Sequence, residues 1–178
     1  ISPIVAGAIW SLMFDNRYGP INQVLGWIVG HDMPILWTIQ PELVYPTILV
    51  AEIWQWTPFM FLLLLAALAN VDKSQLEAAA IDGAGYWQIF FRIILPSIWP
   101  VMAIALLIRL LDLFRLFDVV WTLTQGGPGT MTETISIFTY NQGFRQFETS
   151  YTAAVALVIV VALSLLLMWA LKRVKLAR

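Results

Sequence analysis

Long apolar stretches alternate with short polar ones along the chain. Residues 47–69, 98–123 and 151–171 are each apolar for at least the roughly 20 residues that a helix needs to cross a bilayer. Residues 1–14 are also apolar but shorter, and we expect them to be the outer part of a truncated spanning helix. The pattern predicts an all-α integral membrane protein with about four spanning helices, the first one truncated. Residues 1–178 should form a single transmembrane domain.

The polar segments between these stretches differ in character. Residues 15–20 are typical of a turn, and residues 21–27 of a short helix at the membrane interface. Residues 124–150 form a polar connection that opens with Gln-Gly-Gly-Pro-Gly. Residues 70–100, here called the polar segment, lie between the first two complete spans and hold several helix start and stop signals. The polar segment is therefore the strongest candidate for a functional element.

Two short helices are predicted within the polar segment. Ser74 and Glu77 have the spacing of a capping box, so a first helix should begin directly after the serine. Gly83 can take the left-handed conformation that ends a helix. A second helix with an aromatic face should follow over residues 84–95 and end at Pro96. Two short helices bent at a glycine are suited to docking on another protein, and the pattern is equally typical of an amphipathic connector on the membrane surface.

Composition places the chain in the membrane class. Hydrophobic residues make up 60% of the chain and charged residues 12%, which is more apolar surface than a soluble domain of this size needs. The net charge of −1 provides no basic surface for nucleic acid. The lack of cysteine excludes disulfides and thiolate-bound metals. The single histidine, His31, is expected to be solvated rather than a metal ligand.

Lysine and arginine residues near the helix ends indicate the orientation in the membrane. Lys73, Arg92 and four basic residues at the C-terminus lie on one side, whereas Arg17 and Arg145 lie on the other. Basic residues are enriched in cytoplasmic loops. The polar segment and the C-terminus are therefore predicted to be cytoplasmic.

Five charged residues within the predicted spans require an explanation, because a charge near the bilayer centre costs about 3 kcal/mol or more. They are Glu52, Arg109, Asp112, Arg115 and Asp118. One interpretation is a structural ladder of ion pairs, three residues apart, along one helix. The other is a polar chamber for a hydroxyl-rich solute, with Glu52 pairing with Arg115 across it and neighbouring aromatic side chains stacking on a sugar ring.

Motifs of the polar segment resemble those of a known family. Glu77-Ala78-Ala79, Asp82-Gly83-Ala84 and Ile93-Ile94-Leu95-Pro96 are similar to the EAA loop of bacterial ABC importer permeases. Gly-Pro-Ile-Asn at residues 19–22 and Leu-Thr-Gln-Gly-Gly-Pro at residues 123–128 are similar to the carbohydrate branch of that family. Specifically, these motifs resemble the first permease subunit of maltose- and glycerol-phosphate-type importers. The similarity covers nearly the whole chain.

This resemblance implies a MetI-like permease core in the bacterial cytoplasmic (inner) membrane. Its partners would be a second permease subunit, an ABC ATPase dimer and an extracytoplasmic solute-binding protein. Residues 70–100 would be the cytoplasmic coupling loop, which contacts the ATPase through Glu77, Ala78, Ala79, Asp82 and Gly83. The family's solute-contacting positions, carried over by position, are Glu52, Gln55, Trp56, Phe59, Arg109, Leu113 and Leu116, to which the charged residues Asp112 and Arg115 are added. The charges depart from the maltose-type pattern and suggest a different or smaller sugar.

The family resemblance implies import of a sugar into the cytoplasm by alternating access, without chemistry in this chain. The chain contains no Gly-x-x-x-x-Gly-Lys-Ser/Thr phosphate loop, so ATP and Mg²⁺ should be bound by the partner ATPase and no cofactor by this chain. Import of a glycerol phosphate or another small polar solute is the main alternative, because Arg109 and Arg115 would suit a phosphate. A membrane enzyme lacks a supporting catalytic signature, and a non-transporting scaffold would be expected to lack an associated ATPase and binding protein.

Overall fold

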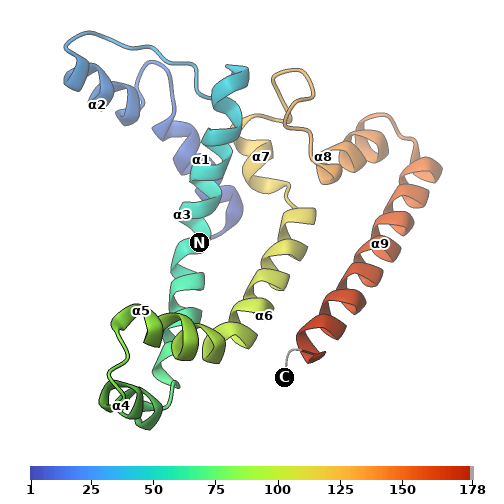
Figure 1. The fold of residues 1–178 in the computed structure, drawn as a ribbon. Helices are drawn as coiled ribbons and strands as arrows, with labels where there is room; N and C mark the ends of the chain where they lie inside the picture. The colour runs from blue at the N-terminus through green and yellow to red at the C-terminus, as the bar shows by residue number, and fades with distance from the viewer. Residues whose placement is uncertain (177–178) are drawn as a thin grey trace. The chain divides into compact units, whose positions relative to one another are not determined.

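The computed structural model describes the backbone of residues 1–176 and the side chains of residues 1–172, and the described secondary structure is entirely helical. In chain order (Figure 1) the α-helices are α1 Pro3–Met13, α2 Pro20–Val29, α3 Pro41–Ala69, α4 Lys73–Ile81, α5 Tyr86–Ile89, α6 Leu95–Phe114, α7 Asp118–Leu123, α8 Ile135–Tyr140 and α9 Thr149–Leu176. There are also two π-helical turns: η1 Phe90–Ile94, between α5 and α6, and η2 Asn141–Arg145, directly after α8. The all-α prediction is confirmed.

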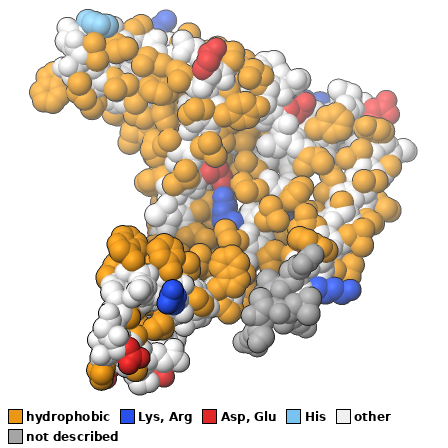
Figure 2. All heavy atoms as spheres, viewed as in Figure 1, with side chains coloured by type: hydrophobic (Ala, Val, Ile, Leu, Met, Phe, Trp, Pro, Cys, Tyr) orange, Lys and Arg blue, Asp and Glu red, His pale blue; other side chains and the backbone are white. Residues whose placement is uncertain are grey.

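Three helices are long and apolar enough to cross a membrane: Pro41–Ala69, the continuous helix Tyr86–Phe114 and Thr149–Lys172. Twenty-nine residues in a helix measure about 43 Å, more than the roughly 30 Å of a hydrocarbon core. At most 17% of each apolar stretch is buried, and hydrophobic side chains cover most of the face seen in Figure 2. Such outward apolar surface is typical of contact with lipid. The remaining apolar helix, α1, has 11 residues and is too short to span.

The second spanning helix differs from its predicted bounds of 98–123, because Pro96 does not end a helix. A proline ring in a regular α-helix clashes with the carbonyl four residues earlier and removes one hydrogen bond. Here η1 directly precedes Pro96, and the Leu95 N–H donates to the carbonyl of Phe90, five residues back. The wider π-helical turn accommodates the proline, so the helix continues from Tyr86 to Phe114.

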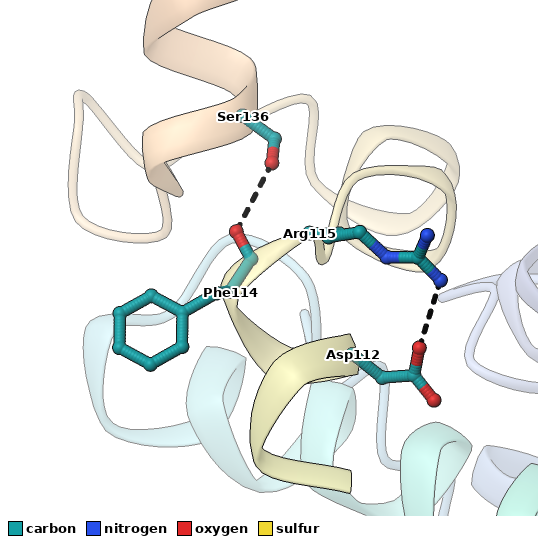
Figure 3. A network of polar contacts seen from close by, with 4 residues as sticks. All are labelled: Asp112, Phe114, Arg115 and Ser136. Atoms are coloured by element: carbon teal, nitrogen blue, oxygen red, sulfur yellow. Dashed lines mark hydrogen bonds and ion pairs between the residues drawn. The ribbon is translucent and has the colours of Figure 1, made fainter. Parts of the chain in front are cut away.

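The same helix ends nine residues earlier than predicted, since Arg115, Leu116 and Phe117 are not helical. Two hydroxyl groups from the start of α8 bind the carbonyls at this end. Thr134 Oγ1 donates to the Leu116 carbonyl at 2.7 Å, and Ser136 Oγ to the Phe114 carbonyl at 3.4 Å (Figure 3). These side chains partner carbonyls at an end where intrahelical donors are lacking. The chain then turns into α7, a separate short helix.

The backbone forms two compact units, and the first comprises residues 1–56 and 112–160. Its core contains residues of α3, α7 and α8: Val44, Ile48, Ala51, Val119, Val120, Leu123 and Ile137. Helix α1 packs on α7 so closely that Gly7 is buried against Thr122. The predicted turn at residues 15–20 is confirmed, because Asp15 Oδ1 accepts the N–H groups of Arg17 and Tyr18 at 2.9 and 2.8 Å. The short helix predicted for residues 21–27 is also present, as α2.

The Gly-Gly-Pro loop between α7 and α8 is held by its own threonines. Thr132, 6% exposed, donates from Oγ1 to the Gly127 carbonyl at 2.7 Å and lies 2.7 Å from Thr124 Oγ1. The Thr132 N–H donates to the Gly126 carbonyl, and the Tyr45 hydroxyl of α3 donates to the carbonyl of Met131. The Gly127–Pro128 peptide bond is cis. Residues 124–150 are thus more ordered than the predicted polar connection, since they also contain α8 and η2.

The second unit comprises residues 57–111 and 161–178. It contains the C-terminal part of α3, the short helix α4, the continuous helix from α5 into α6, and the C-terminal part of α9. Ile98 and Ala105 of α6 and Ala170 of α9 are its buried apolar side chains among those described. Its other described side chains are exposed or half-buried.

Candidate functional site

Helix α4 begins at Lys73, two residues earlier than predicted, because Asp72 caps it instead of Ser74. Asp72 Oδ1 accepts the Ser74 N–H at 2.9 Å, as expected for an N-cap carboxylate. Hydrogen bonding by the Ser74 side chain, and then by its N–H, holds the pKa of Asp72 below its ordinary value of 3.8. The prediction that Ser74 caps this helix through a capping box with Glu77 is therefore wrong, although the predicted helix exists. An ionised carboxylate two residues earlier is a better acceptor for the same end of the helix.

At its other end α4 is closed by Gly83, as the sequence predicted. Gly83 has φ +77°, in the left-handed region. The Ala84 N–H donates to the Ala79 carbonyl at 3.0 Å and the Gly83 N–H to the Ala80 carbonyl at 3.1 Å. This pair of hydrogen bonds is the Schellman motif, which fixes the direction in which the chain leaves a helix. The bend between the two short helices is thus set by the backbone.

Nearly all of the α4 surface is accessible. Glu77, Ala78, Asp82 and Gly83 are exposed, and Ala79 is half-buried. None of the nine residues of α4 is buried, and Ile81 is 87% exposed. A helix this short is marginal alone, so its capped ends contribute much of its local stability. The five predicted coupling residues therefore lie together on a short helix and its terminal turn.

Removing the Asp72 carboxylate should loosen α4. In Asp72→Ala, amide hydrogens of α4 should exchange about five-fold faster at neutral pH, because an alanine N-cap costs helix stability. Hydrogen–deuterium exchange of the full-length protein measures this, and Asp72→Asn, which retains an acceptor, should exchange nearly as wild type. Because the folded pKa is lowered, the contribution is complete above pH 3.8 and disappears as the pH falls through the lower folded value. Equal exchange by wild type and Asp72→Ala at neutral pH would contradict the assignment.

The predicted pathway residues of α3 lie at i, i+3, i+4 and i+7 and share one side of that helix: Glu52, Gln55, Trp56 and Phe59. Glu52 is 6% exposed, Gln55 and Trp56 are half-buried, and Phe59 is 42% exposed. The Gln55 Oε1 atom is buried and accepts no hydrogen bond from the described residues. Buried polar atoms of this kind call for a partner. The Gln55 oxygen is enclosed by its surroundings and would need a partner from beyond the described residues.

The predicted pathway residues of the next span are separated by the break after α6. Arg109, Asp112 and Leu113 lie within α6, whereas Arg115 and Leu116 lie in the non-helical link to α7. Arg115 Nη2 lies 2.9 Å from Asp112 Oδ1, and the Arg115 side chain is 77% exposed (Figure 3). The predicted pairing of Glu52 with Arg115 is wrong, because Arg115 projects from the link and binds Asp112. The continuous charge ladder is likewise wrong, since Asp118 opens a different helix, α7.

An aromatic cluster near this break was not predicted. Phe117 stacks on Trp121 with ring centroids 5.3 Å apart, and Tyr140 of α8 contacts both rings at 5.4 and 5.2 Å. The Arg145 guanidinium lies 5.0 Å above the Trp121 ring. The aromatic residues come from separate elements, so only their abundance was visible in the sequence. Among the described residues, no group of three or more histidine or carboxylate side chains is arranged to hold a metal ion.

Residues 3–175 match the family described as "Binding-protein-dependent transport system inner membrane component". A probable ABC transporter permease of Sinorhizobium fredii is 35% identical over 97% of this chain and 56% of its own length. The trehalose/maltose transport system permease protein of Thermococcus litoralis is 40% identical over 79% of this chain and 47% of its own length. The lactose transport system permease protein of Rhizobium radiobacter is 34% identical over 93% of this chain and 57% of its own length. The chain thus spans about half the length of these curated relatives.

The fold is also similar to a solved permease structure. A chain in the crystal structure of a bacterial alginate ABC transporter, in complex with an alginate pentasaccharide-bound periplasmic protein, superimposes with a TM-score of 0.84 at 28% identity. The similarity covers 96% of this chain and 59% of that one. Family, relatives and fold agree with the resemblance found in the polar segment. The chain therefore belongs to the inner membrane components of binding-protein-dependent ABC transporters, with permeases of sugar transport systems among its relatives.

Proposed function

We propose that the protein is a permease subunit of an ATP-driven importer, and that it moves a sugar into the cytoplasm by alternating access. The observation that carries the proposal is α4, a short helix that buries none of its side chains and is fixed at both ends. Such a helix between two spanning helices can transmit movement from a bound ATPase to the transmembrane region. Glu77, Ala78, Ala79, Asp82 and Gly83 would contact that ATPase.

The partners and the location follow from the same proposal. A second permease subunit would complete the pathway, an ATPase dimer would bind ATP and Mg²⁺, and an extracytoplasmic binding protein would deliver the solute. The multi-pass chain would lie in the bacterial cytoplasmic membrane. The distribution of lysine and arginine supports an orientation with α4 and the C-terminus in the cytoplasm.

A sugar is the substrate class that the residues favour. Two of the three relatives named above are named for trehalose/maltose and lactose transport, and a further relative, from Agrobacterium fabrum, is named for sulfoquinovosyl glycerol. In this chain Glu52 and Gln55 place a carboxylate and an amide, groups whose oxygens can accept hydrogen bonds from hydroxyl groups, on one side of α3. Import of a glycerol phosphate is less favoured, because one of the two arginines proposed for a phosphate, Arg115, already binds Asp112.

Uptake by the complete importer tests this proposal. The full-length permease, its partner permease and the ATPase would be reconstituted in proteoliposomes with the binding protein, and labelled trehalose, maltose, lactose and glycerol 3-phosphate compared. Wild type should accumulate at least one of the sugars, and only with ATP. Glu52→Gln should lower sugar uptake about ten-fold, because a charged hydrogen bond contributes about 1.5–3 kcal/mol.

Leu49→Ile, on an exposed position of the same helix, is the matched control and should transport normally. Arg109→Ala separates the alternatives, since a phosphate-importing permease would lose uptake of glycerol 3-phosphate specifically. ATP-dependent uptake of glycerol 3-phosphate but of no sugar would refute the sugar assignment.

A further inference from the structure

A small cavity lies between the end of α1 and the segment that precedes α3, entirely within the first compact unit. Its volume is about 150 Å³, far above the roughly 10–15 Å³ that one water molecule requires. Five of the lining residues carry polar groups: Ser11, Asp15, Asn16, Trp37 and Thr38. The remaining lining side chains are apolar. We call this cavity the outer-loop pocket, and none of its residues belongs to the predicted substrate pathway.

The walls of the outer-loop pocket are joined by one buried side chain. Asn22 of α2 is 7% exposed and accepts the Trp37 Nε1–H at 2.7 Å. Its amide group donates to the Ile35 carbonyl at 3.0 Å and to the Asn16 carbonyl at 3.3 Å. Asn22 thus connects both chain segments that line the cavity. The Trp37 ring is further held against Phe14, with centroids 5.4 Å apart. A pocket built this way is largely preformed, as ligand sites usually are.

Asp15 gives the pocket its electrostatic character. Both hydrogen bonds that its carboxylate accepts from the described residues use Oδ1, so Oδ2 retains its capacity as an acceptor. A carboxylate with the ordinary pKa of 3.8 is ionised at neutral pH, and the N–H groups of Tyr18 and Arg17 lower the pKa of Asp15 further. A negative carboxylate in the wall favours ligands that donate hydrogen bonds and disfavours anionic ones.

We propose that the outer-loop pocket binds one ring of a neutral saccharide, at a site separate from the substrate pathway. A carboxylate, an amide and two hydroxyls match the donors and acceptors of sugar hydroxyls, and the Trp37 indole, which also lines the cavity, adds aromatic surface that can contact the ring. The choice of a saccharide rests on the proposed function. On the proposed orientation, residues 15–46 lie on the extracytoplasmic side, so a sugar would meet this pocket before it enters the membrane.

Protection of an introduced thiol tests the pocket without requiring transport. The chain contains no cysteine, so Thr38→Cys places one reporter in the wall. A maleimide would label this variant in the purified complete importer, with the label located by peptide mass spectrometry. Maltose, trehalose or lactose should slow labelling, because only unoccupied pockets react. At a sugar concentration ten times its dissociation constant, the labelling rate should fall about ten-fold. Glycerol 3-phosphate should not slow labelling.

Two further variants identify the cause of any protection. Val29→Cys, an exposed position on α2 outside the pocket, should be labelled at the same rate with or without sugar. Asp15→Asn retains an acceptor for the turn but removes the charge, and in the Thr38→Cys background it should weaken protection several-fold. If none of the three sugars protects the thiol, sugar binding in the outer-loop pocket is refuted, even when the importer transports sugar. Protection that Asp15→Asn leaves unchanged, or that extends equally to Val29→Cys, also refutes it. Absence of sugar uptake would refute the proposed function instead, whatever the labelling.

Discussion

Replacing Gly83 with valine should lower ATP-driven solute uptake about ten-fold or more while leaving the amount of protein in the membrane unchanged. Gly83 has φ +77°, a conformation that costs an L-residue with a β-branched side chain about 1–3 kcal/mol. A Cβ atom there would meet nothing within 4 Å, so the effect would come from the backbone and not from a steric clash within the chain. Loss of the Schellman motif would redirect the chain between α4 and α5. Uptake and the ATPase activity stimulated by the binding protein measure the coupling.

Asparagine is the matched control for this position, because it tolerates the left-handed conformation better than other non-glycine residues. Gly83→Asn should retain most of the uptake. A larger change, Gly83→Trp, adds bulk to the surface proposed to contact the ATPase and should uncouple transport with membrane insertion intact. Normal uptake by Gly83→Trp would count strongly against a coupling role for this turn.

The spanning helices were predictable because the bilayer imposes one simple requirement, a continuous apolar helix of about 20 residues. The predicted stretches 47–69 and 151–171 lie within the observed helices Pro41–Ala69 and Thr149–Lys172. The middle helix, Tyr86–Phe114, begins 12 residues before and ends nine residues before the predicted stretch 98–123. Its start was missed because η1 accommodates Pro96, and a π-helical turn has no simple sequence signal.

The end of the middle helix depends on distant residues. Nothing in Arg115-Leu116-Phe117 is a helix breaker, and the link is instead stabilised by hydroxyl groups about twenty residues later. The charge ladder inferred from regular spacing failed for the same reason, although its central pair, Asp112 and Arg115, exists. Tertiary hydrogen bonds outweighed local helix propensity here.

The two parts of the candidate site were predictable to different degrees. The coupling residues lie on contiguous chain, so a local motif located the helix and the glycine that ends it. The choice of Ser74 over Asp72 as its cap was wrong, since both residue types are good caps and stand two positions apart. The outer-loop pocket joins residues 11–16 to residues 36–39 through Asn22, and no periodicity in the sequence indicates such a contact.

The contact between α1 and α7 gives the largest effect expected on stability. A Cβ atom on Gly7 would lie 1.8 Å from Thr122 Oγ1 and 2.9 Å from Thr122 Cβ. Rotation of the threonine cannot relieve the second contact, and its hydroxyl already donates to the Asp118 carbonyl at 2.6 Å. Gly7→Ala should therefore destabilise the protein by about 1–3 kcal/mol, more than the roughly 1 kcal/mol that alanine gains over glycine in a helix. Thermal unfolding of the full-length protein in detergent would show this as a lower Tm.

A double-mutant cycle with Thr122→Ala would assign the loss to this contact. Thr122→Ala removes the oxygen that clashes at 1.8 Å but keeps the Cβ atom at 2.9 Å, so it should restore part of the Tm in the Gly7→Ala background. The coupling energy between the two changes should reach about 0.5–3 kcal/mol, as for residues in direct contact. Ala8→Leu, at the exposed neighbouring position of α1, controls for added bulk and should leave the Tm nearly unchanged. A wild-type Tm for Gly7→Ala would mean that α1 and α7 do not pack at this distance, and the first compact unit would then need another explanation for its buried glycine.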